Sequence, residues 1–154
     1  MYERIVVGTD GSASANVAVD AAIELAKLSG ATLHVVSAYK ASVGTQFAAG
    51  TELGIPVQDI VEANEMKQTS AQACCDHAAE RAQAVGVTTQ THSVAGDAAE
   101  AILQVAEQAG CDLLVVGNRG MSGVRRFMLG NVPNKLSHHS PASLLIVDTR
   151  SARQ

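Results

Sequence analysis

Two hydrophobic periodicities alternate along this chain of 154 residues. Short runs of consecutive apolar residues, bounded by turn residues, are typical of buried strands. They predict strands at residues 4–9, 32–38, 113–116 and 143–147, and a β-branched segment predicts a fifth strand at residues 88–94. Between the predicted strands, apolar residues at the spacing of one helix face predict helices at residues 15–28 and 98–109. A segment rich in Ala, Glu and Gln predicts a long helix at residues 58–85, and Asn131 and Pro141 bound a short predicted helix at residues 131–139.

The regular alternation of strands and helices predicts an α/β fold. We expect a single doubly wound domain over residues 1–150, built on a five-stranded parallel sheet with helices on both faces. The segment 88–94 is β-branched but polar, which predicts a strand at the sheet edge. We expect the chain to fray after Asp148 and residues 151–154 to form a disordered tail. The glycine-rich segment 39–57 predicts a long irregular loop, whose role stays open.

Residues that favour helix ends support these boundaries. Ser12 and Asp97 precede two of the predicted helices, and both are common N-cap residues because a side-chain oxygen accepts a backbone N–H there. Asn131 is predicted to cap the last helix, with Pro133 in its first turn.

The segment 113–133 joins a buried strand, a glycine-rich loop and a helix start. This order presents backbone N–H groups to an anion, and Gly117, Gly120 and Gly130 allow a ligand to approach the backbone closely. The net charge of the chain is −4, yet residues 113–147 contain no Asp or Glu. The Lys and Arg residues of that span are Arg119, Arg125, Arg126 and Lys135. We therefore interpret the segment as an anion site, and the alternative of a surface loop with solvated arginines stays open.

Composition narrows the class of protein further. The acidic balance argues against a general nucleic-acid binder, and no apolar run reaches the length of a membrane span. The N-terminus lacks a signal-peptide pattern, so we expect a cytoplasmic protein. The cysteines at 74, 75 and 111 are odd in number and lack metal-ligand spacing, which argues against a disulfide framework or a zinc site. The sequence has no Walker, G-x-S-x-G or H-E-x-x-H motif, and we predict no catalytic residues.

The spacing Gly117-x2-Gly120-x9-Gly130 resembles the nucleotide loop in the ATP-binding branch of the universal stress protein family. The similarity extends to residues 5–12 and 96–102 and to the last strand, so it covers nearly the whole chain. The resemblance implies the strand order 3-2-1-4-5, which places the ends of the first and fourth strands side by side. In open α/β sheets this is where ligands bind.

The resemblance also implies a set of residues that bind an adenine nucleotide. They are Thr9, Asp10, Gly11, Ser12, Ala38, Gly117, Asn118, Arg119, Gly120, Ser122, Gly130, Asn131 and Val132. Asp10 is placed to accept a ribose hydroxyl or to hold a phosphate-bound metal; the alternative is a local turn former. The family has Ser or Thr where this chain has Asn131, which donates through its NH2 but is larger. ATP, AMP and cyclic AMP, with or without Mg²⁺, therefore stay open as ligands.

We expect a stress-response binding module that takes an adenine nucleotide, with no nucleic-acid or membrane partner. The aliphatic last strand, at a sheet edge, predicts a homodimer paired through that strand, as the resemblance also implies. Two alternatives stay open: a slow metal-dependent nucleotide hydrolase, and an interaction protein that binds no nucleotide.

Overall fold

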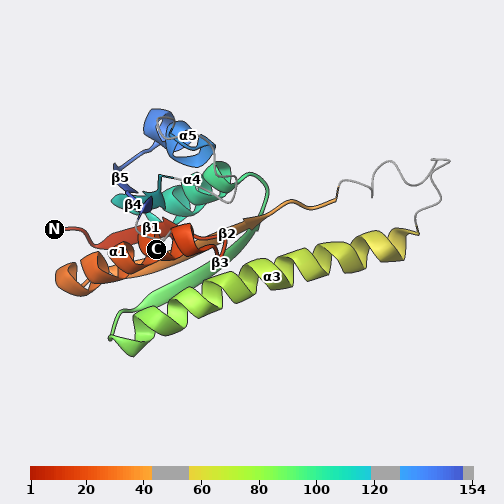
Figure 1. Cartoon of the computed structure of the whole chain (residues 1–154), viewed down its shortest axis with the longest axis horizontal. Helices are drawn as coiled ribbons and strands as arrows, with labels where there is room; N and C mark the ends of the chain where they lie inside the picture. The colour runs from red at the N-terminus through yellow and green to blue at the C-terminus, as the bar shows by residue number, and fades with distance from the viewer. Residues whose placement is uncertain (43–55, 119–128, 151–154) are drawn as a thin grey trace.

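The computed structural model describes residues 1–42, 56–118 and 129–150, and its parallel strands form one five-stranded sheet in the order β3-β2-β1-β4-β5 (Figure 1). The strands are β1 (Arg4–Gly8), β2 (Thr32–Tyr39), β3 (Thr89–Ala95), β4 (Leu113–Gly117) and β5 (Ser143–Val147). The helices are α1 (Ala13–Ser29), α3 (Val57–Ala84), α4 (Ala98–Ala109) and α5 (Asn131–His139). The α/β fold class, the strand order and the helices on both faces are as predicted from the sequence.

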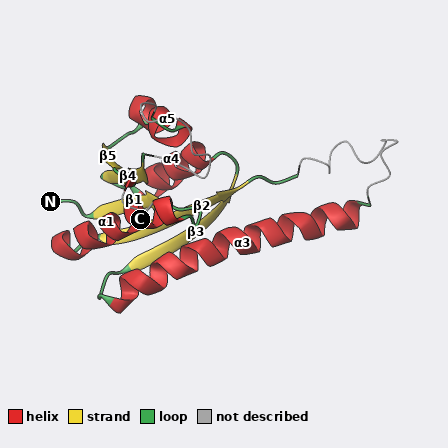
Figure 2. Ribbon diagram, viewed as in Figure 1, coloured by secondary structure: helices red, strands yellow, loops and turns green. Residues whose placement is uncertain are grey.

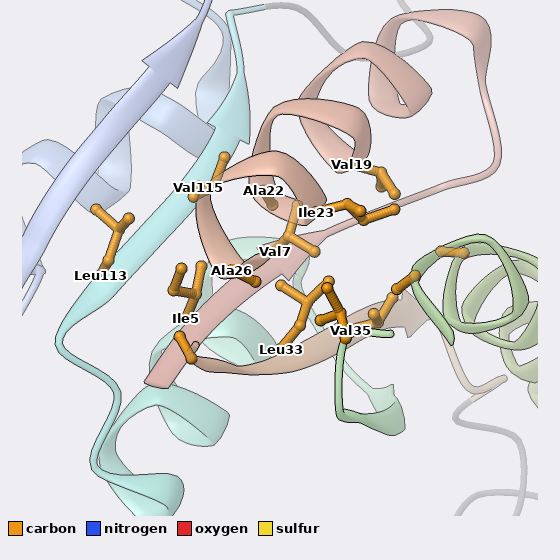
Figure 3. Close-up of a cluster of buried hydrophobic side chains, with 14 of the residues drawn as sticks. Ile5, Val7, Val19, Ala22, Ile23, Ala26, Leu33, Val35, Leu113 and Val115 are labelled. Atoms are coloured by element: carbon orange, nitrogen blue, oxygen red, sulfur yellow. The ribbon is translucent and has the colours of Figure 1, made fainter. Parts of the chain in front are cut away.

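One face of the sheet packs against α1 and α3. In the central strands every second side chain points to this face, as in Ile5 and Val7 of β1 and Leu33 and Val35 of β2. They meet small side chains of the two helices, such as Ala22 of α1, in a closely packed cluster (Figure 3). We call this side the α1/α3 face.

The side chains at the alternate strand positions point to the opposite side of the sheet, which is covered by α4 and α5 and which we call the α4/α5 face. Val6, Val36 and Leu114 pack there against α4, and Leu136 of α5 is fully buried among them. Because both faces of the central strands are covered, those strands are apolar throughout, as parallel strands in such folds require. Strand β3 lies at one edge, as predicted, and is partly buried along most of its length.

Helix α3 is much longer than the strands it covers. It contacts β2 and β3 through its C-terminal half, while its N-terminal half extends past the sheet (Figure 2). No helix among the described residues is both long and apolar enough to cross a membrane.

The helix ends agree with the sequence prediction at two places and differ at one. Ser12 caps α1 by accepting the Ala15 N–H, and Asp97 caps α4. At α5, however, Gly130 occupies the N-cap position and Asn131 is the first helical residue, so the predicted cap at Asn131 is wrong. Gly130 has the extended backbone that a cap position needs (φ −58°, ψ 162°), which moves the helix start by one residue.

The C-terminal segment also differs from expectation. Thr149 is only 2% exposed and is hydrogen-bonded to Asn118, so the chain does not fray after Asp148. Residues 151–154 lie outside the described part of the chain, as do residues 43–55 of the predicted loop.

Candidate functional site

A cavity of about 360 Å³ lies at the carboxyl ends of β1, β2 and β4, under the start of α5. It lies where the crossovers from β1 and β4 run in opposite directions along the sheet. Its lining residues are Gly8, Thr9, Asp10, Ala15, Val36, Ala38, Ala98, Ile102, Val116, Gly117, Asn118, Leu129, Gly130, Asn131, Val132 and Pro133. This is the position at which open α/β sheets bind ligands.

The structure brings together eight of the residues that the sequence singled out. Those that line the cavity are Thr9, Asp10, Ala38, Gly117, Asn118, Gly130, Asn131 and Val132. Gly11 and Ser12 do not line it and belong instead to the turn between β1 and α1. Arg119, Gly120 and Ser122 lie outside the described residues, as do Arg125 and Arg126.

The turn after β1 is held by its own side chains. The Asp10 Oδ1 atom accepts the backbone N–H of Ser12 at 2.9 Å, and the Thr9 hydroxyl oxygen accepts that of Gly11 at 3.2 Å. Gly11 has φ +76°, and a Cβ there would lie 2.9 Å from the Cys74 sulfur of α3. Asp10 is thus a turn former, and it also lines the cavity with an exposed carboxyl group.

The inner walls of the cavity are apolar. Ile102 of α4, Val36 of β2 and Val116 of β4 are each at most 3% exposed. Gly8 lies close to this wall, and a Cβ there would lie 2.6 Å from the Ile102 Cδ1 atom, so the Ile102 side chain would have to move. The sequence prediction missed Ile102 and Ala98 as lining residues, since the helical apolar pattern shows only that they face the sheet.

The cavity meets the N-terminus of α5 on its outer side. Among the described residues no side chain caps this helix. The N–H groups of Asn131 and Val132 therefore lack the intrahelical acceptors that later residues have, and Pro133 has no N–H. The helix dipole adds partial positive charge at the same point, so the arrangement favours an anion.

Helices α4 and α5 are joined by an ion pair beside this site. Lys135 Nζ lies 3.3 Å from Asp97 Oδ1, and Asp97 also accepts the N–H groups of Ala99 and Glu100. Burial raises the pKa of Asp97, but these N–H donors and the Lys135 ammonium outweigh burial and leave the pKa below its usual value. The ionised Asp97 carboxylate therefore serves to cap α4 and to pair with Lys135.

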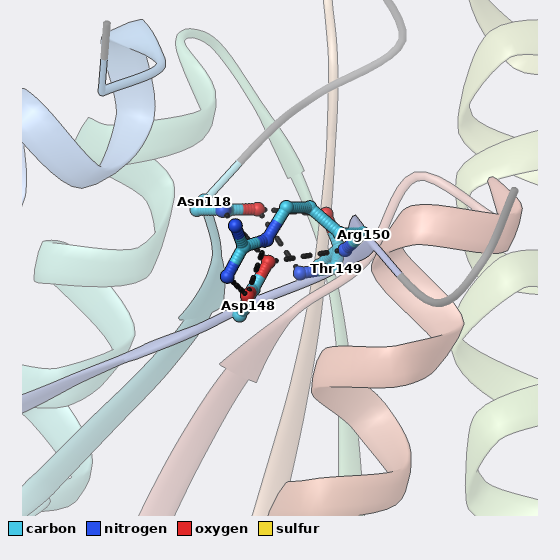
Figure 4. A network of polar contacts seen from close by, with 4 residues as sticks. All are labelled: Asn118, Asp148, Thr149 and Arg150. Carbon is cyan, nitrogen blue, oxygen red and sulfur yellow. Dashed lines mark hydrogen bonds and ion pairs between the residues drawn. The ribbon is translucent and has the colours of Figure 1, made fainter. Parts of the chain in front are cut away.

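Asn118, at the end of β4, uses its side chain to hold the C-terminal segment. Its Oδ1 atom accepts the Thr149 N–H at 3.1 Å and the Thr149 hydroxyl at 2.7 Å, and its Nδ2 atom donates to Asp148 at 3.4 Å (Figure 4). Arg150 pairs with the Asp148 carboxylate. The amide of Asn118 is thus engaged at both ends by protein groups.

The remaining polar groups in the core lie away from the cavity. His34, which is 4% exposed as expected for a packed histidine, contacts His92 with 3.1 Å between Nδ1 and Nε2. Burial lowers the pKa of both rings, and the charges of His92 and Arg4 further lower that of His34. Burial likewise raises the pKa of the Cys75 and Cys111 thiols to about 11. In the described part of the chain, no three such side chains converge to hold a metal ion.

Comparisons with known proteins agree with this architecture. The model of the universal stress protein family matches residues 1–148. Universal stress protein YxiE from Bacillus subtilis (strain 168) is 35% identical over 148 residues, which cover 96% of this chain and 99% of that protein.

Solved structures give the same result. A crystal structure of a universal stress protein in complex with cAMP is 32% identical, with a TM-score of 0.69, and the match covers 96% of this chain and 98% of that one. The structure of hypothetical protein MJ0577 shares the fold at 20% identity, with a TM-score of 0.80 and 96% of each chain covered.

Proposed function

The chain belongs to the universal stress protein family, and from this we propose that it binds an adenine nucleotide in the cavity at the ends of β1 and β4. The observation that carries the proposal is one cavity with apolar inner walls that meets an uncapped helix N-terminus. Its volume of about 360 Å³ falls within the range of small-molecule sites, which begins near 300 Å³.

Each part of a nucleotide has a counterpart in this cavity. The base takes the apolar space between Ile102, Val36 and Val116. A ribose hydroxyl donates to the exposed carboxylate of Asp10, and a phosphate lies against the N–H groups at the start of α5.

Which nucleotide binds depends on the part of the cavity that would meet the phosphate, at the start of α5. The relative that shares 32% of its sequence with this chain was crystallised with cAMP, which carries a single phosphate. Asn131 stands at the start of α5, where its side-chain NH2 can donate to such a phosphate. We therefore propose AMP or cyclic AMP as the first ligands to test and ATP as the comparison.

Thermal unfolding with ATP, ADP, AMP, cyclic AMP and GTP, each with and without magnesium, tests the proposal. A ligand present at 100 times its Kd stabilises the fold by about 2.7 kcal/mol. For a domain of this size that raises Tm by about 5–10 °C. If no adenine nucleotide raises Tm, in protein shown to carry no co-purified nucleotide, the proposal is wrong.

A pair of variants at Asp10 separates binding from folding. Asp10→Asn keeps an oxygen for the Ser12 N–H, so the turn and the Tm of the free protein stay close to wild type, while the ribose contact weakens. Asp10→Ala loses both contacts. If Asp10→Asn bound the nucleotide with wild-type affinity, the Asp10 carboxylate would not be part of the binding site.

We also propose that two copies of the chain pair through β5. This strand is at the sheet edge, and its apolar residues, Leu144 to Val147, are only partly buried. Light scattering across a dilution series tests this directly, since a monomer at micromolar concentration would contradict it.

A further inference from the structure

Asn118 connects three parts of the chain at the rim of the cavity. Its backbone N–H donates to the carbonyl of Val147 at 2.9 Å, which ties the end of β4 to the end of β5. Its own carbonyl accepts the N–H of Gly130 at 3.3 Å. Gly130 is the N-cap of α5, so the position of Asn118 sets where the uncapped helix start lies.

The side chain of Asn118 is held in turn by Thr149. The Thr149 hydroxyl and backbone N–H both donate to the same amide oxygen, at 2.7 and 3.1 Å (Figure 4). Thr149 is only 2% exposed, so this contact is shielded from water. Removing the hydroxyl would leave the partly buried amide oxygen with a single donor from Thr149, which loosens the hold on the Asn118 side chain.

The backbone segments at Asn118 and Gly130 lie close together. A Cβ on Gly130 would lie 3.3 Å from the Asn118 carbonyl oxygen, so the two chain segments already approach closely. Loss of the side-chain anchor frees the Asn118 backbone at the end of β4, and a shift of its carbonyl is passed to Gly130 through their hydrogen bond.

We infer that Thr149 is a positioning residue for the phosphate end of the cavity, acting through Asn118 on Gly130 and the start of α5. The inference rests on the proposed nucleotide site for its ligand. It assigns a role in binding to a residue that does not itself line the cavity.

Calorimetric titration of AMP and adenosine into Thr149→Val tests the inference. The variant keeps the shape of the side chain and the backbone N–H but loses the hydroxyl. We expect its affinity for AMP to fall by about fivefold, the lower end of typical coupling between sites. Its affinity for adenosine stays at the wild-type value, because adenosine has no phosphate to meet α5. Thr149→Ser keeps the hydroxyl and restores AMP binding.

A matched control is Thr91→Val, which removes a threonine hydroxyl that accepts the side-chain N–H of Gln72 on the α1/α3 face. It should leave both affinities unchanged. An equal loss for AMP and adenosine in Thr149→Val would show a merely structural role and overturn the inference, as would an unchanged affinity for AMP.

Amide hydrogen exchange in the free protein gives a second readout that needs no ligand. Thr149→Val should speed exchange at Gly130, whose N–H is bonded to the Asn118 carbonyl, and at Asn134, whose N–H is bonded to the Gly130 carbonyl, while Thr149→Ser and Thr91→Val do not. If wild-type protein binds neither AMP nor adenosine, the proposed function fails, and exchange alone decides the inference. Unchanged exchange at Gly130 then overturns it.

Discussion

The two faces of the sheet are covered by helices in different ways. On the α1/α3 face, alanines and Cys75 let the helices pack closely on the strands, and every residue of the cluster is at most 8% exposed. On the α4/α5 face, α5 is only nine residues long and begins beyond the strand ends. The space between its start and the strand ends is the cavity.

Both faces also carry polar contacts. The α4/α5 face has the His34–His92 contact and the Asp97–Lys135 ion pair, and on the α1/α3 face Arg81 of α3 pairs with Asp20 of α1. The buried apolar side chains are well covered on both faces, at most 8% exposed on the α1/α3 face and at most 6% on the α4/α5 face. In the described part of the chain, the feature that distinguishes the α4/α5 face is therefore the cavity next to the start of α5.

The largest expected contrast comes from the same substitution on each face. Ala22→Leu adds bulk at a site that is 0% exposed, and overpacking should lower the free energy of unfolding by about 1–3 kcal/mol. Ala38→Leu fills the cavity instead, so it should leave stability nearly unchanged while AMP affinity falls at least about tenfold. Urea denaturation and calorimetry measure the two effects. Normal AMP binding by Ala38→Leu would show that the cavity is not the site.

A substitution at the start of α5 tests the anion site more narrowly. Gly130→Asp supplies a cap to the Val132 N–H and places a negative charge where a phosphate would lie. Relative to Gly130→Ala, we expect AMP affinity to fall about tenfold while adenosine affinity changes little. Gly130→Ala adds the same Cβ without the carboxylate and is the control. Equal AMP affinity in the Asp and Ala variants would contradict a phosphate at this helix.

Loss of the cap on α4 should have a smaller effect, and on stability alone. Asp97→Ala removes the acceptor for two backbone N–H groups, which costs about 1 kcal/mol and lowers Tm by about 2–4 °C. Asp97→Asn keeps a cap oxygen and loses only the half-exposed ion pair with Lys135, so its Tm should stay near wild type. If Asp97→Asn were as destabilised as Asp97→Ala, the ion pair would outweigh the cap.

The smallest effect concerns pH and the contact between the buried His34 and the partly buried His92. Because burial lowers the pKa of His34 and His92 in the folded protein, the unfolded chain binds protons first as pH falls below about 6.5. Their contribution to stability is therefore present above that pH and is lost as pH falls toward the lowered pKa values. Tm should decrease between about pH 7.5 and 5.5, and His92→Gln should flatten the decrease.

The control for this measurement is His77→Gln, which replaces an exposed histidine of α3. It should leave the pH dependence of Tm unchanged. If Tm depended on pH identically in wild type and His92→Gln, the His34–His92 pair would make no contribution to the pH dependence of stability.

Local patterns were sufficient for most of the fold. Apolar runs and helical spacing located most of the strands and helices described, because burial of a strand or a helix face requires that periodicity wherever the element lies. Local composition located the other elements, among them the polar, β-branched strand β3 and the Ala-rich helix α3. Ser12 and Asp97 were found as caps for the same reason, since a cap acts on N–H groups two or three residues away. The glycine spacing, by its resemblance to a family, added the strand order.

Contacts between segments that are distant in the sequence could not be predicted from these local patterns. Ile102 of α4 takes its place in the cavity wall beside Gly8 of β1, which leaves room for its Cδ1 atom. Thr149 is buried because Asn118 accepts both of its donors. Neither partner is recognisable from its neighbours in the sequence. A periodic pattern records which side of an element is buried, whereas the packing of separate elements sets which residues meet there and where space remains for a ligand.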